Sequence, residues 1–87
     1  MTRYTVLWTE AAEDDLAEIW CAYSDRQVIT AAADKIDVEL REDATLKGLP
    51  LSDGSKVISS GPLSIFFRVS PADRKVVVGS VQLSESN

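Results

Sequence analysis

The stretch LSIFFRVSPADRKVVVGSVQL, from Leu63 to Leu83, decides how this chain folds. Apolar and polar residues alternate before the turn SPAD at 70–73, and a valine-rich run follows that turn. Alternation with a period of two is typical of a strand with one buried face, and a short turn of this kind joins antiparallel neighbours. The stretch therefore predicts a β-hairpin.

The register of this hairpin follows from its turn if Val69 and Arg74 close it as a pair. Two pairs then face inward, Phe67 with Val76 and Ile65 with Val78. Three pairs face outward: Arg68 with Lys75, Phe66 with Val77, and Ser64 with Gly79. An outward face of this kind is half apolar and half cationic, and an anion between the two cations would relieve their repulsion. The alternative is that these cations are solvated edge charges and that a slip of one residue turns Phe66 inward.

Upstream of the hairpin, the apolar residues repeat first with the period of a strand and then with the period of helices. Residues 3–8 alternate, and Thr9 is placed to cap a helix that follows. Apolar stripes at spacings of three and four predict that helix over 10–23 and a second one from Asp25 to Lys47, ended by Gly48. A loop at 51–54 and a short strand at 56–59 complete the pattern.

The predicted order of elements is β-α-α-β-β-β, a single α+β domain over residues 1–87. We expect a two-helix hairpin packed on one face of a small antiparallel sheet, because this arrangement buries the apolar surface of both layers. The opposite face of the sheet is left to solvent or to a partner. Trp8, Trp20 and Tyr23 lie at the spacings of core residues and are expected to be packing anchors.

Composition excludes several classes of site. The chain has nine Lys and Arg against fourteen Asp and Glu, a net charge of −5, and no histidine. The absence of histidine excludes Ser-His-Asp and Cys-His catalytic arrangements and the usual zinc sites, and no other ligand cluster indicates a metal or a cofactor. A single cysteine, Cys21, no signal pattern and no long apolar run favour a soluble cytoplasmic protein without a membrane partner.

Three motifs carry a resemblance to a known family: Tyr4-x-Val-x-Trp8, Ala-x-x-Asp-Leu16-x-x-Ile-Trp20 and Gly61-Pro-Leu-x-Ile-Phe-Phe-Arg-Val69. Over almost its whole length the chain resembles the RelE/ParE superfamily of toxins from type II toxin–antitoxin systems. The resemblance implies a RelE/ParE-like fold held inactive by a cognate antitoxin, growth inhibition when the toxin is free, and a role in plasmid stabilisation. It leaves open a homodimer or a toxin–antitoxin hetero-oligomer.

The resemblance also implies one of two targets. RelE-like members cleave ribosome-bound mRNA with arginines and a proton donor, whereas ParE-like members poison DNA gyrase. Ser59 and Ser64 stand where the cleaving members have arginine, and no Tyr, His or Lys follows the last strand. We interpret the chain as ParE-like or catalytically degenerate and assign no catalytic residue. The alternatives are a non-toxic module that binds an antitoxin-like partner and an active ribosome-dependent mRNA endoribonuclease.

Two groups of residues are the candidates for binding. Those expected to contact the target or its phosphates are Lys56, Arg68, Arg74 and Lys75. Those expected to contact a protein partner are Phe66, Val77 and Val81.

Overall fold

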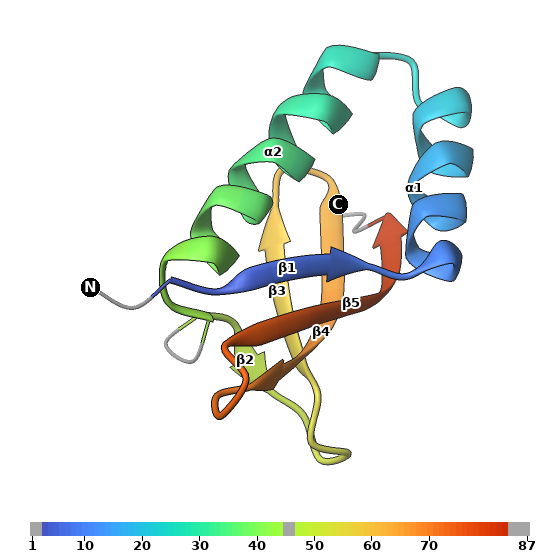
Figure 1. Cartoon of the computed structure of the whole chain (residues 1–87). Coiled ribbons are helices and arrows are strands. Elements are labelled where there is room, and N and C mark those ends of the chain that lie inside the picture. The colour runs from blue at the N-terminus through green and yellow to red at the C-terminus, as the bar shows by residue number, and fades with distance from the viewer. Residues whose placement is uncertain (1–2, 45–46, 84–87) are drawn as a thin grey trace.

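The computed structural model describes residues 3–44 and 47–83, and these form two helices over one sheet (Figure 1). The helices are α1 (Glu10–Ala22) and α2 (Arg26–Asp43). The strands are β1 (Thr5–Trp8), β2 (Leu49–Pro50), β3 (Lys56–Ser60), β4 (Leu63–Ser70) and β5 (Lys75–Leu83). Within the described ranges the strand order is β1-β5-β4-β3-β2. The predicted α+β class and the helix pair are confirmed.

The sheet is mixed rather than antiparallel. β1 runs parallel to β5, with Val6 beside Val76 and Trp8 beside Val78. The hairpins β3–β4 and β4–β5 are antiparallel as predicted, because tight turns join them. No turn fixes the direction of β1, since both helices lie between it and the rest of the sheet.

The segment around Pro50, predicted as a helix end and a loop, contributes a short strand. β2 pairs with β3 at the edge of the sheet, where the missing N–H of a proline is tolerated. α2 ends at Asp43, earlier than predicted, while residues 45–46 lie outside the described residues.

The register of the β4–β5 hairpin is two residues away from the predicted one. Ser70 pairs with Lys75 and Val69 with Val76, so Arg74 lies in the turn, where its φ is 52°. A shift of two residues keeps every side chain on its face of the sheet. The inward positions predicted for Ile65, Phe67, Val76 and Val78 are therefore confirmed, and each of these residues is at most 1% exposed.

A β-bulge then changes the alternation of β5. Phe67 pairs with Val78 but Phe66 pairs with Ser80, which leaves Gly79 as an extra residue in β5. An extra residue reverses the faces of the residues that follow it. For this reason Val81, a candidate for contact with a protein partner, is 3% exposed and belongs to the core.

The core lies between the sheet and α2. Its largest fully buried side chains come from α2, β4 and β5: Ile29, Ile36, Leu40, Leu63, Ile65, Phe67, Val76 and Val78. α1 buries only Ala12 completely, while Leu16 and Ile19 are half-buried against the core. Trp8 and Tyr23 also pack against it, whereas Trp20 is 38% exposed. α1 is therefore the less deeply packed helix.

Thr9 caps α1 as predicted, and Asp25 caps α2. The hydroxyl of Thr9 accepts a hydrogen bond from the N–H of Ala12 at 3.1 Å and donates one to the carbonyl of Val78 at 2.9 Å. Asp25 accepts a bond from the N–H of Gln27 at 3.2 Å. Thr9 thus starts α1 and fixes its first turn to β5.

Asp15 of α1 covers an edge of β5 that β1 leaves open. β1 ends opposite Val78, and beyond that point the carboxylate of Asp15 accepts a hydrogen bond from the N–H of Val81 at 3.2 Å. Asp15→Ala removes this acceptor, so we expect a loss of about 1–3 kcal/mol in the free energy of unfolding, measured by urea denaturation. Asp14→Ala, which removes an exposed neighbouring carboxylate, should stay within about 0.5 kcal/mol of the parent. Equal losses in the two variants would contradict this role of Asp15.

Gly48 and Gly61 form a matched pair with left-handed backbone, at φ values of 75° and 54°. A Cβ on Gly48 would lie 2.8 Å from the carbonyl oxygen of Val57 and 3.0 Å from the ring of Phe67, whereas one on Gly61 would meet only Ala32 at 3.7 Å. Gly61→Ala should lower the free energy of unfolding by about 1–2 kcal/mol, because alanine is strained in a left-handed backbone. Gly48→Ala should lower it by about 2–4 kcal/mol, because the added Cβ also clashes with its neighbours. Thermal unfolding of both variants tests the difference, and equal melting temperatures would refute the close approach.

Candidate functional site

The side of the sheet that faces away from the helices carries an apolar surface with two cations, which we call the outer face. The register places Leu7 of β1 beside Val77 of β5, and Val77 opposite Arg68 of β4. The outer face consists of Leu7, Leu49, Val57, Phe66, Arg68, Lys75 and Val77. Leu7, Val77 and Leu49 are 46%, 37% and 70% exposed. The outward positions predicted for Phe66 and Val77 are confirmed, and the one-residue slip does not occur.

The cations on the outer face do not form the predicted opposed pair. Arg68 is opposite Val77, and Lys75 is opposite Ser70, so the two cations lie diagonally on the same face. An anion bound between them would therefore have to span a wider gap than in the predicted register.

A neighbouring acid partly balances Arg68. The guanidinium Nη2 of Arg68 lies 3.9 Å from the carboxylate of Asp53, and both side chains are well exposed. The hydroxyl of Ser55 donates to Asp53 at 2.6 Å and its N–H donates at 3.0 Å. These bonds, with a smaller contribution from Arg68, hold the pKa of Asp53 below its usual value. Asp53 therefore stays ionised at neutral pH, and a phosphate that binds Arg68 has to compete with it.

The other two candidate cations lie elsewhere. Lys56 pairs with Phe67, whose side chain is in the core, so Lys56 lies on the helix side of the sheet. Arg74 is exposed in the turn between β4 and β5. The four candidate cations therefore do not share one face, and the outer face holds two of them, Arg68 and Lys75.

The two serines at the positions of the expected arginines face each other. Ser59 and Ser64 are directly opposite in the β3–β4 pair, and their hydroxyl oxygens are 3.2 Å apart, within hydrogen-bond distance. Neither hydroxyl carries a positive charge, so this pair cannot balance charge that develops on a phosphate.

A second surface, a groove between α1 and α2, was not predicted from the sequence. Its volume is about 720 Å³. Its apolar lining includes Trp8 of β1, Leu16, Ala17 and Trp20 of α1, and Ile29 and Ala33 of α2. The charged residues that line it are Glu13, Asp34 and Asp37, all acidic. In Figure 1 the two helices diverge from their connection at residues 23–25.

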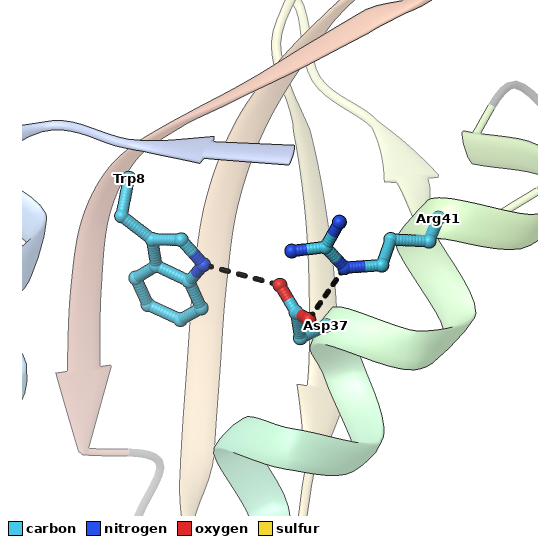
Figure 2. Close-up of polar contacts among 3 residues, drawn as sticks. All are labelled: Trp8, Asp37 and Arg41. Carbon is cyan, nitrogen blue, oxygen red and sulfur yellow. Dashed lines mark hydrogen bonds and ion pairs between the residues drawn. The ribbon is translucent and has the colours of Figure 1, made fainter. Parts of the chain in front are cut away.

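Hydrogen bonds hold both indole rings of the groove. The Nε1 of Trp8 donates to Asp37 at 3.3 Å, and Asp37 also accepts from the Nε of Arg41 at 2.7 Å (Figure 2). The Nε1 of Trp20 donates to the hydroxyl of Thr30 at 3.3 Å. The guanidinium carbon of Arg26 lies 4.4 Å from the centre of the Trp20 ring, the geometry of a cation–π contact.

These indoles were interpreted from the sequence as packing anchors. Trp8 packs against the core and also lines the groove, whereas Trp20 is 38% exposed and lines the groove. The sequence carried one signal that we missed. Residues 31–33 of the second helix are all alanine, and this helix was expected to face the helix that bears Trp20. Ala33 lines the groove, because it is too small to fill the space that a larger side chain would occupy.

Two further features complete the description. No group of three or more Cys, Asp or Glu residues placed to hold a metal ion occurs among residues 3–44 and 47–83. Within the same ranges, neither helix combines the length and the apolar character that a membrane span requires.

Comparisons with known proteins identify the fold. No protein-family model matches the chain, and no curated protein matches it in sequence. In structure it is similar to a chain of the RelBE2 toxin–antitoxin complex of Mycobacterium tuberculosis, with 22% identity, a TM-score of 0.79 and coverage of 95% of this chain and 93% of that one. It is also similar to the chromosomal ParDE system of P. aeruginosa, with 18% identity, a TM-score of 0.74 and coverage of 98% and 100%.

A third similar structure is a free double mutant of the E. coli toxin RelE, at 22% identity, a TM-score of 0.69 and coverage of 95% of this chain and 85% of that one. The architecture is thus one that toxin–antitoxin proteins share. More particularly, the chain has the RelE/ParE fold, which confirms the fold expected from the sequence motifs.

The exposure of Arg68 gives a prediction about stability. Its side chain is 62% exposed and its ion pair with Asp53 is long, at 3.9 Å, so Arg68→Ala should change the free energy of unfolding by no more than about 0.5 kcal/mol. Phe67→Ala, one residue away but in the core, should cost about 3–5 kcal/mol. Chemical denaturation of both variants is the measurement, and a large loss for Arg68→Ala would show that this residue is structural.

Proposed function

We propose that this protein is the toxin of a type II toxin–antitoxin system and that a cognate antitoxin keeps it inactive. The observation that carries the proposal is the extent of the fold match, which covers 95% of this chain and 93% of a chain from a complex named as toxin–antitoxin. The protein would inhibit growth in the cytoplasm when free and would stabilise a plasmid that encodes the pair.

We propose further that the toxin acts without cleaving RNA, in the manner of ParE-like proteins that poison DNA gyrase. Ser59 and Ser64 support this, because they place two neutral hydroxyls, bonded to each other, where cleavage requires cations. The chain also has no histidine to act as general acid or base at neutral pH. On the outer face, Arg68 and Lys75 offer charge for binding a target, and Phe66 and Val77 offer apolar contact.

Within this proposal the two surfaces have different roles. The groove between α1 and α2, apolar and about 720 Å³ in volume, takes the antitoxin and so forms a hetero-oligomer. The outer face is the surface that meets the target. Separation of the surfaces allows mutations to affect toxicity and neutralisation independently.

The test is expression of the chain in bacteria with and without the product of a short adjacent gene. We expect the free chain to arrest growth and the adjacent product to restore it. Arg68→Ala should relieve the arrest at least tenfold in viable count while antitoxin binding is retained, whereas Lys35→Ala, which removes an exposed cation from α2, should not. Growth that continues at soluble, folded levels of the parent chain would refute toxicity.

Assays with purified components separate the targets. Gyrase supercoiling and ribosome-dependent mRNA cleavage are measured with the same preparation of the free chain. Inhibition of gyrase without mRNA cleavage supports the proposal, whereas mRNA cleavage would identify an endoribonuclease. Antitoxin binding with neither effect would identify a non-toxic binding module.

A further inference from the structure

Charge is unequally distributed between the two layers of the fold. Residues 10–43, which include both helices, contain eleven acidic and three basic residues, whereas the rest of the chain contains three acidic and six basic residues. The helical layer therefore carries a net charge of −8 and the remainder +3, which together give the −5 of the whole chain. A partner that docks on the helices meets a strongly negative field.

This charge reaches the groove at identifiable positions. Glu13 belongs to α1 and Asp34 to α2, so carboxylates flank the groove from both helices. Both residues are exposed, and within the described ranges neither has an ion pair. Asp37 differs, because it already accepts bonds from Trp8 and Arg41. Glu13 and Asp34 are thus the two groups available to a partner's charge.

The lining of the groove has the length of a short helical contact. Its residues on α1 run from Glu13 to Cys21, which at 1.5 Å per residue corresponds to about 12 Å. A bound helix that anchors residues i, i+4 and i+7 spans about 10.5 Å. The indole N–H groups are used within the protein, so the floor offers apolar ring surface rather than hydrogen-bond donors.

We infer that the groove between α1 and α2 selects an amphipathic helix whose apolar stripe is flanked by Lys or Arg, and that Glu13 and Asp34 bind these cations. The inference rests on the proposed function for the origin of the helix, which would be a segment of the antitoxin. An acidic helix with the same apolar stripe is rejected, because its carboxylates would be repelled by those of Glu13 and Asp34.

The probes are two synthetic peptides of about 15 residues, long enough to form a helix, with identical leucine stripes. One carries Lys beside the stripe and the other carries Glu. Each is labelled, and its binding to the full chain is measured by fluorescence anisotropy. We expect the Lys peptide to bind at least tenfold more tightly than the Glu peptide, with the difference shrinking at high salt.

Charge reversal tests whether the groove itself makes this choice. Glu13→Lys with Asp34→Lys should weaken the Lys peptide about tenfold and strengthen the Glu peptide. The control is Asp14→Lys with Glu42→Lys, which changes the net charge equally at exposed positions that do not line the groove. The control pair should retain the preference for the Lys peptide. Circular dichroism confirms that both double variants are folded.

The outcomes are decisive for the inference and separate from those for toxicity. Equal weakening by the two double variants would show that only net charge matters and would overturn it. The inference would also be overturned if the chain bound neither peptide, even if small apolar molecules entered the groove. If the Lys peptide binds as described but the free chain does not arrest growth, the charge selection stands and the proposed toxicity fails. If the free chain arrests growth and an antitoxin neutralises the Glu13→Lys, Asp34→Lys variant as well as the parent, the proposed toxicity stands and the charge selection fails.

Discussion

The pairing of β1 with β5 is the constraint on which the rest of the structure depends. It brings the first strand beside the last one, and Thr9 then links the start of α1 to the carbonyl of Val78. Both helices lie in the chain between β1 and the other four strands, so they return across the sheet and cover one side of it. The other side stays open, and the limited packing of α1 leaves the groove beside α2.

The periodicity of the sequence predicted the positions of the helices and the buried faces of the strands. Spacings of three and four located both helices, and alternation assigned Phe67 and Val76 to the core because those patterns depend only on which face of an element is apolar. The direction of β1 and the strand at Pro50 depend on pairing between distant segments, which no local pattern encodes. The bulge at Gly79 has the same origin, and it turns Val81, a candidate for partner contact, into the core.

The candidate site shows the same division. Arg68, Phe66 and Val77 were placed outward correctly, since a two-residue error in register preserves the face. The sequence did not show which candidate cations share a face, because whether Lys56 and Arg68 do so depends on the pairing of β3 with β4. The groove was missed altogether, because it depends on how α1 and α2 pack against each other and not on either amphipathic stripe.

The positions of the indoles have a spectroscopic consequence. The chain has two tryptophans, Trp8 and Trp20, and both line the groove. The tryptophan emission of the protein therefore originates entirely at this surface, where displaced water and a new apolar neighbour shift its wavelength. The native chain is its own optical reporter of groove occupancy and requires no attached dye.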